Sequence, residues 1–273
     1  MRLLEDKVAI ITGAARGIGQ ATAELFAQHG AKIVMSDIDP APLNEAAAAI
    51  SQTKAQVHAV PGDVTDPQFS DKLIKATLEK FGGLDIIVNN AGYTWDGVIH
   101  KMTDQQWQAI IDCHLTAPFR IVRAASSFIR ETAKKEQAEQ GRAKARKIIC
   151  ISSTSGTRGN AGQVNYAAGK SGVIGLARTL AKEWGMFNVQ SNAVAFGWIN
   201  TRLTHAKEEQ VKIKRENTDI ELGIPADRLQ LMSRMIPMGR AGTPHEAAGA
   251  VLFFASPLSD YVSGQVLEVA GGL

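Results

Sequence analysis

Residues 8–19 read VAIITGAARGIG, and this stretch decides the fold class of the 273-residue chain. Its first five residues are apolar or β-branched, as in a strand that is buried on both faces. Glycines follow at positions 13, 17 and 19, and the next residues have the spacing of an amphipathic helix. Glycine permits a sharp turn and lets backbone N–H groups approach a phosphate at the helix N-terminus. The stretch therefore predicts a strand, a phosphate-binding turn and a helix.

The same alternation continues along the chain. Short apolar runs occur at residues 8–12, 32–37, 57–63, 85–90, 147–153, 189–195 and 265–271. Buried strands that alternate with amphipathic helices predict an α/β fold with a doubly wound parallel sheet of seven strands. No linker divides the chain, so a single domain over residues 1–273 is expected. Because such sheets bind ligands beyond the carboxyl ends of their strands, site residues are expected directly after the strands.

The composition argues against several classes of protein. Hydrophobic residues make up 45% of the chain and charged residues 21%, and the net charge is +3. This charge is too small and too scattered for a nucleic-acid interface. No apolar run approaches the roughly 20 residues of a membrane helix. Cys113 and Cys150 have no metal-ligand or disulfide-framework spacing, so no metal site is predicted and a cytoplasmic location is expected.

Two stretches depart from the strand–helix repeat. Residues 130–147 form a charged insertion of mixed sign, which favours a solvated helix end and loop over a docking patch. Residues 200–238 are long and mix apolar with charged side chains. A connection of this length in a compact domain is usually a binding loop, so it is predicted to be a mobile substrate lid.

The second predicted strand ends in Asp37. A carboxylate at this point can accept hydrogen bonds from both hydroxyls of a nucleotide ribose, and it repels a 2′-phosphate of about −1.5 to −2 charges. This favours NAD(H) as the cofactor. Arg16 in the glycine turn opposes the inference, because a guanidinium can pair with a 2′-phosphate, so NADP(H) stays possible. Taken alone, Asp37 can also be read as a helix cap before Pro40.

Tyr166 and Lys170 stand four residues apart in NYAAGK, which places them on one face of a helix. An adjacent ammonium is expected to lower the pKa of the phenol by up to roughly three units, enough for acid–base catalysis near neutral pH. Ser153 ends the fifth strand and can hold a substrate oxygen while its charge changes. Taken separately, the first two residues can be a surface pair and Ser153 a turn former.

These motifs resemble the short-chain dehydrogenase/reductase family nearly from end to end, most closely its 3-oxoacyl-ACP reductase branch. The resemblance rests on TGAARGIG, Asp63-Val64, NNAG at 89–92, Ser153, Tyr166-x-x-x-Lys170 and GQVLEVAGG. It implies a Rossmann domain, commonly tetrameric, that transfers hydride between nicotinamide and a carbonyl or secondary alcohol. Lys170 would also hold the nicotinamide ribose. The other cofactor residues so implied are Gly13, Arg16, Gly17, Ile18, Gly19, Asp63, Val64, Asn90, Gly92, Ile199 and Thr201.

Two positions depart from the family pattern. His114 stands where the family usually has an asparagine that helps to anchor a water in the proton relay. A neutral histidine can also donate and accept, so His114 is a candidate for a modified relay or, alternatively, a packed helix-face residue. Phe196 replaces the family's proline beside Gly197, which leaves the glycine alone to turn the backbone. The aromatic ring can contact the nicotinamide or fill the core.

The sequence thus predicts an NAD(H)-dependent oxidoreductase, and its resemblance implies a 3-oxoacyl or 3-hydroxyacyl thioester substrate. A dehydrogenase for a steroid, sugar or polyol is an alternative, because fold does not settle substrate. A second alternative is a protein that senses nucleotides and catalyses no reaction. Cations of the predicted lid could receive the phosphates of a CoA or carrier-protein arm, or could simply be solvated. They are Lys207, Lys212, Lys214, Arg215, Arg228 and Arg234.

Overall fold

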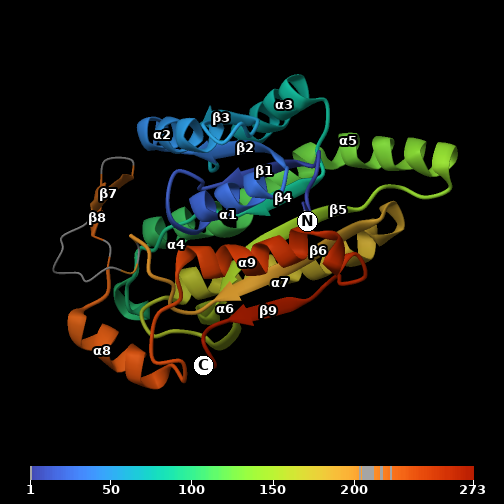
Figure 1. Cartoon of the computed structure of the whole chain (residues 1–273). Coiled ribbons are helices and arrows are strands. Elements are labelled where there is room, and N and C mark those ends of the chain that lie inside the picture. The colour runs from blue at the N-terminus through green and yellow to red at the C-terminus, as the bar shows by residue number, and fades with distance from the viewer. Residues whose placement is uncertain (1, 203, 205–211, 216–217, 222) are drawn as a thin grey trace.

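The centre of the molecule is a parallel sheet of seven strands with helices on both faces (Figure 1). The computed structural model describes residues 2–202, 204, 212–215, 218–221 and 223–273. The strands lie in the order β3-β2-β1-β4-β5-β6-β9. Their bounds are β1 Val8–Thr12, β2 Lys32–Asp37, β3 Val57–Pro61, β4 Ile86–Asn89, β5 Arg146–Ser153, β6 Val189–Phe196 and β9 Val266–Val269. All seven strands expected from the sequence are present, and the predicted doubly wound fold is confirmed.

Helices cover the sheet in two layers, each with its own apolar core. The bounds are α1 Gly17–Gln28, α2 Pro40–Ser51, α3 Phe69–Phe81, α4 Asp104–Ile111, α5 Ala117–Gln140, α6 Thr154–Arg158, α7 Val164–Trp184, α8 Ala226–Met235 and α9 Pro244–Ala255. One core joins the sheet to α3, α5 and α7, and the other joins it to α1, α2 and α9. Neighbouring residues of β1 divide between them, since Ile10 belongs to the first core and Ile11 to the second. This alternation follows from the two-residue period of a strand.

The strand order reverses beside β1. The chain leaves β1 toward β2 and β3 on one side, and it resumes at β4 on the other side. The loops that follow β1 and β4 therefore separate, and a crevice is left at the carboxyl edge of the sheet. The fold thus opens a cavity at the position expected for the site.

The charged insertion is built around a buried ion pair. The long helix α5 extends beyond the sheet (Figure 1) and ends at Gln140, with Gly141 as its C-cap residue. Arg146, the first residue of β5, donates two hydrogen bonds of 2.9 and 2.8 Å to the carboxylate of Glu136. Glu136 also accepts the backbone N–H of Lys144 at 2.9 Å. The segment predicted as a solvated helix end and loop is therefore anchored to the sheet by one of its charges.

The predicted lid contains a β-hairpin that the sequence reading did not foresee. Strands β7 (Lys212–Arg215) and β8 (Thr218–Glu221) pair in antiparallel register, and the buried residues Ile213 and Ile220 lie opposite each other. The helix α8 follows, with Arg234 exposed in its last turn. Lys207 lies outside the described residues, as do the side chains of Lys212, Lys214, Arg215 and Arg228.

Within the described ranges, no helix is both long enough and apolar enough to cross a membrane.

Candidate active site

A cavity of about 500 Å³ lies at the carboxyl edge of the sheet. It is lined by the loops that follow β1, β2, β3, β4, β5 and β6, together with parts of α7 and α8. The structure brings almost all of the predicted site residues to this one cavity. They are Gly13, Arg16, Gly17, Ile18, Asp37, Asp63, Val64, Asn90, Gly92, His114, Ser153, Tyr166, Lys170, Ile199 and Thr201.

Gly19 is the exception, because it lies under the glycine turn rather than in the cavity wall. A Cβ at Gly19 would lie 2.1 Å from the carbonyl oxygen of Gly13, so only glycine allows the turn to pack on the helix. Gly13 has a φ of 64°, and a Cβ there would lie 2.7 Å from the Cα of Ala91. The side chain of Asn90 donates to the carbonyl oxygens of Thr12 and Gly13 at 2.9 and 3.1 Å. Asn90 thus braces the turn.

The N-terminus of α1 suits a phosphate group. The helix starts at Gly17, its N-cap residue Arg16 makes no side-chain cap hydrogen bond, and its first turn has no acidic residue. A Cβ at Gly17 would contact only Thr201, at 3.5 Å, so the backbone is open toward the cavity there. Free N–H groups and the helix dipole favour an anion at such a position. These residues fit the pyrophosphate of a dinucleotide.

Asp37 lies in the cavity wall at the end of β2. Its carboxylate accepts the backbone N–H groups of Ala15 and Asp39, each at 3.1 Å. These two bonds fix the side chain next to the glycine turn. Nη1 of Arg16 lies 2.8 Å from Oδ2 of Asp39, so this guanidinium is paired within the protein. The sequence reading did not identify Asp39, although it stands two residues after Asp37.

Further along the wall, two short turns present the other predicted cofactor residues. Asp63 accepts the backbone N–H and the hydroxyl of Thr65 at 2.8 and 2.7 Å, which holds the turn that carries Val64. Thr204 donates to the carbonyl oxygen of Ile199 at 2.5 Å and accepts the backbone N–H of Thr201 at 2.9 Å. Local side-chain bonds of this kind order loops without regular structure.

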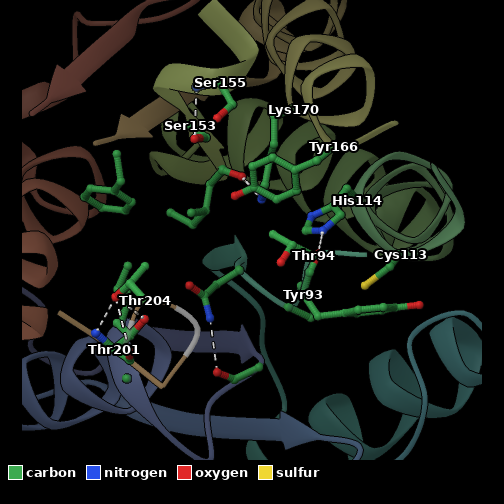
Figure 2. Close-up of a pocket in the computed structure, with 18 of the residues that line it drawn as sticks. Tyr93, Thr94, Cys113, His114, Ser153, Ser155, Tyr166, Lys170, Thr201 and Thr204 are labelled. Carbon is green, nitrogen blue, oxygen red and sulfur yellow. Dashed lines mark hydrogen bonds between the residues drawn. The ribbon is translucent and has the colours of Figure 1, made fainter. Parts of the chain in front are cut away.

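Ser153, Tyr166 and Lys170 meet at the other end of the cavity (Figure 2). Ser153 ends β5, and its hydroxyl accepts the backbone N–H of Ser155 at 3.1 Å. Tyr166 and Lys170 share one face of α7, with Nζ of Lys170 5.6 Å from the centroid of the tyrosine ring. Nζ donates to the carbonyl oxygen of Ile151 at 2.6 Å. Two neighbouring elements thus place the three side chains together.

The expected direction of the Tyr166 pKa shift is wrong. Burial raises the pKa of Tyr166 to about 12, and a hydrogen bond with Ser153 opposes this only in part. Burial also lowers the pKa of Lys170 to about 8. Desolvation disfavours the charged form of each group, and it is the largest cause of both shifts. Tyr166 is therefore held as a neutral phenol, the form that donates a proton.

His114 is buried beside Tyr166 in a short π-helix over Asp112–Thr116. Its ring meets the Tyr166 ring edge to face, with centroids 5.0 Å apart and an interplanar angle of 86°. Nε2 lies 2.7 Å from the carbonyl oxygen of Tyr93. Burial, and next the charge of Lys170, lower the pKa of His114 well below its ordinary value. The imidazole is therefore neutral.

Phe196 fills the core, which is one of the two alternatives left open by the sequence, and it also borders the cavity. It is the last residue of β6, where it pairs with Ser153 on β5 and with Val269 on β9. Its ring belongs to the core formed with α1, α2 and α9, and the residue also lines the cavity. At Gly197, a Cβ would lie 2.8 Å from the side chain of Ala270. The need for glycine thus comes from close packing.

The sequence reading missed the wall opposite the cofactor residues. The side chain of Gln163 accepts from Ser155 and Asn160 at 3.0 and 2.9 Å and donates to Asp96 at 3.0 Å. Trp95, Trp198, Ile224 and Met232 add apolar surface to the cavity. The position of Gln163 three residues before Tyr166 was the available signal. Ile224 and Met232 belong to the predicted lid at 200–238, whereas Trp95 and Trp198 lie in loops whose course the sequence does not reveal. In the described portion, no group of three or more His, Cys, Asp or Glu residues could hold a metal ion.

Comparisons with known proteins agree with this architecture. A family model described as Enoyl-(Acyl carrier protein) reductase matches residues 13–273. The 3-oxoacyl-[acyl-carrier-protein] reductase of Vibrio cholerae is 39% identical over 99% of this chain and 98% of its own length. The Escherichia coli protein of that name is 37% identical over 98% of each chain. A solved structure described as a short-chain alcohol dehydrogenase of Sinorhizobium meliloti superposes with a TM-score of 0.84 at 30% identity, over 98% of this chain and 96% of that one. The chain belongs to the short-chain dehydrogenase/reductase family.

Proposed function

We propose that the protein is an NAD(H)-dependent reductase of 3-oxoacyl thioesters, which converts the 3-oxo group to a 3-hydroxyl group. The observation that carries the proposal is the placement of Ser153, Tyr166 and Lys170 at one end of a cavity whose other end holds Asp37. The near full-length similarity to proteins named 3-oxoacyl-[acyl-carrier-protein] reductase supports the substrate class.

The acid–base residues have separate roles in this reaction. Ser153 donates a hydrogen bond to the substrate carbonyl oxygen and stabilises the negative charge that develops there. Tyr166 donates its proton to the same oxygen, and its pKa of about 12 keeps it protonated before the reaction. Lys170 supplies positive charge beside the phenolate that is left. The bound dihydronicotinamide would supply the hydride that reduces the carbonyl carbon.

The cofactor would extend along the cavity from Asp37 to Tyr166. The glycine turn and the start of α1 would hold its pyrophosphate, and Asp37 would accept hydrogen bonds from the adenosine ribose. Two features support NAD(H) over NADP(H): the Asp37 carboxylate, and the pairing of Arg16 with Asp39. The remaining contacts are assigned to Ile18, Asp63, Val64, Asn90, Gly92, Lys170, Ile199 and Thr201.

Reduction of a carbon–carbon double bond is a second candidate, because the matching family model is described as an enoyl reductase. The hydroxyl groups of Ser153 and Tyr166 favour the carbonyl reaction, since both can bond to one developing oxyanion. Dehydrogenation of a steroid, sugar or polyol uses the same acid–base residues. A sensor without turnover is disfavoured because all three acid–base side chains line the cavity.

We also propose a homotetramer located in the cytoplasm. A closed tetramer with dihedral symmetry needs two kinds of interface, and two groups of exposed apolar side chains could supply them. Trp107 and Phe119 lie on α4 and α5, and Phe253, Leu258, Tyr261 and Leu267 lie on α9, β9 and the segment between them. Light scattering should show smaller assemblies for Phe119→Glu and for Tyr261→Arg. Cys113 and Cys150 are buried and form no disulfide, which suits a reducing compartment.

The reaction type can be tested with two substrates of equal chain length. Acetoacetyl-CoA offers a carbonyl at C3, whereas crotonyl-CoA offers only a double bond. With NADH in excess, mass spectrometry should find 3-hydroxybutyryl-CoA from the first substrate and no reduced product from the second. Butyryl-CoA formed from crotonyl-CoA, with acetoacetyl-CoA left intact, would replace the proposal with enoyl reduction. If neither substrate reacts although NADH binds, the thioester assignment is wrong, and a panel of steroid, sugar and polyol alcohols with NAD⁺ then separates another dehydrogenase from a sensor.

A further inference from the structure

A second, smaller cavity adjoins the first one. It has a volume of about 120 Å³, and Trp198 and Ile199 line both cavities. Phe196, the last residue of β6, pairs with Ser153 on β5, so the loop that starts at Gly197 leaves the sheet beside the acid–base residues. Trp198 therefore stands between the reacting end of the first cavity and the second cavity.

The second cavity suits an apolar group. Besides the two shared residues, its apolar lining comes from Met238, Val269, Ala270 and Gly271. Arg240 and Glu246 also line it, but both are exposed and they bond to each other at 2.9 and 2.6 Å, so neither charge lacks a partner. An apolar cavity of about 150 Å³ can bind benzene, so this one has room for a short stretch of alkyl chain.

Trp198 has a fixed backbone and a side chain without a polar anchor. Its carbonyl oxygen accepts the backbone N–H of Gly242 at 3.0 Å, and the N–H of Gly197 donates to the carbonyl oxygen of Val269 at 3.0 Å. By contrast, the indole Nε1 is buried and has no hydrogen-bond partner among the residues that the structure describes. A buried indole N–H usually has such a partner. The ring is thus held by packing, and its removal would leave no other polar group unpaired.

The surface near the reacting end indicates how a substrate would lie. The cofactor would occupy much of the first cavity, which leaves the substrate the end beside Ser153. Asp96 and Gln163, joined by a hydrogen bond of 3.0 Å, give this end a polar surface, and Trp198 and Met232 give it an apolar one. Polar groups suit the thioester and its carrier arm, whereas apolar side chains suit the alkyl chain. The alkyl chain would therefore extend toward Trp198.

We propose that Trp198 sets the length of acyl chain that the enzyme accepts, by closing the substrate end of the first cavity against the second. The role rests on the proposed function, because the alkyl chain belongs to the 3-oxoacyl thioester. With the indole in place, the chain ends against the ring and short chains are preferred. Without it, the two cavities join, and the second receives the end of a longer chain. Trp198 is thus a specificity-determining residue.

Chain-length kinetics test this role. Trp198→Ala should raise the ratio of kcat/KM for 3-oxooctanoyl-CoA to that for acetoacetyl-CoA by about tenfold or more, since one methylene in an apolar pocket can be worth about tenfold. Trp198→Leu removes less volume and should raise the ratio by a smaller factor. Trp95→Ala is the matched control, because Trp95 lines the first cavity and not the second. An equal rise in the control, or no rise in either Trp198 variant, would overturn the proposal.

Refilling the second cavity should reverse the change. Met238 lines only that cavity and is 64% exposed, so a larger side chain is tolerated at its position. Met238→Trp should remove the gain for 3-oxooctanoyl-CoA when combined with Trp198→Ala, and by itself it should leave the chain-length preference of the wild type unchanged. Such non-additivity is expected of two residues that border one space. A gain that survives in the double variant would mean that the longer chain lies elsewhere.

Binding measurements test the second cavity without turnover. Octanoyl-CoA and butyryl-CoA have no 3-oxo group to reduce, and calorimetry gives the Kd of each. Trp198→Ala should shift the ratio of the two Kd values by about tenfold or more in favour of octanoyl-CoA. An unchanged ratio would overturn the proposal whatever the reaction. If neither the wild type nor the variants reduce a 3-oxoacyl-CoA of either length, the proposed function fails, and the Kd ratio still decides whether the second cavity receives an alkyl chain.

Discussion

Nη1 of Arg16 lies 2.8 Å from Oδ2 of Asp39, so the single cation of the TGAARGIG turn is paired within the protein. Both side chains are more than a third exposed, and exposed pairs contribute little to stability. The consequence of the pair therefore concerns binding. While it holds, Arg16 is directed toward a carboxylate instead of toward a 2′-phosphate, and Asp37 stands beside it at the end of β2.

Cofactor choice should respond to each of these carboxylates. Asp37→Ser removes the charge expected to repel a 2′-phosphate and should raise the ratio of kcat/KM for NADPH to that for NADH by about tenfold or more. Asp39→Asn releases Arg16 and should raise the same ratio by a smaller factor, with little change for NADH. Asp71→Asn, which makes the same charge change at an exposed position on α3, is the control. Unchanged ratios in both test variants would refute this basis for NAD(H) selection.

Tyr166→Phe removes the proton donor and almost nothing else. We expect a loss of at least about a hundredfold in kcat, because general acid catalysis typically contributes this much. NADH affinity, followed by fluorescence titration, should stay within a small factor of the wild type. Comparable turnover in the variant would mean that another group protonates the substrate.

The pH dependence of reduction should follow Lys170. Burial lowers the pKa of this lysine to about 8, so its positive charge is present below that pH and is lost as the pH rises through it. The charge stabilises the Tyr166 phenolate that forms in the reaction, so kcat for reduction should fall above about pH 8. The arginine of Lys170→Arg stays charged over this pH range. Any activity that the variant retains should therefore not decrease above about pH 8. A flat wild-type profile over this range would contradict the assignment.

The ion pair of Glu136 and Arg146, which anchors the charged insertion, should contribute to the stability of the fold. Glu136→Gln leaves the Arg146 guanidinium, whose side chain is only 4% exposed, without its counter-charge. Removing one partner of a buried pair typically costs about 3 kcal/mol or more in the free energy of unfolding. Glu139→Gln breaks an exposed pair with Lys135 on the same helix and should cost less than about 0.5 kcal/mol. Urea titration of both variants measures the difference, and equal stability would show that the insertion is not anchored in this way.

The stabilisation that the pair of Glu136 and Arg146 contributes should be lost at low pH. Hydrogen bonds from Arg146 hold the pKa of Glu136 below its ordinary value, with burial acting in the opposite direction. A carboxyl whose pKa is lower in the folded state stabilises the fold above its unfolded-state pKa. This contribution is lost as the pH falls through the lowered value. The stability difference between wild type and Glu136→Gln should therefore shrink in acid.

The sequence predicted the seven strands because parallel strands buried on both faces are continuous apolar runs, as in β1 and β5. It also located site residues at the carboxyl ends of those strands, such as Asp37 on β2 and Ser153 on β5. Contacts between loops could not be predicted from the sequence pattern. Gly19 was placed among the cofactor contacts because its spacing matches the motif, yet it packs under Gly13.

The error over the pKa of Tyr166 has a similar origin. The spacing of Tyr166 and Lys170 reveals that they are neighbours, but it does not reveal how much of each is desolvated. Burial depends on every element packed around them, and here it decides the direction of both shifts. The hairpin formed by β7 and β8 was missed because its strands, KIKR and TDIE, are mostly polar and contain no apolar run.

The measurement that tests the central claim most directly is nicotinamide absorbance with acetoacetyl-CoA, recorded in parallel with NADH and with NADPH. We predict steady oxidation of NADH, a much lower kcat/KM with NADPH, and loss of the signal in Tyr166→Phe. Faster oxidation of NADPH would contradict the cofactor assignment. No oxidation of either cofactor, in a protein that binds NADH, would contradict the proposed reaction.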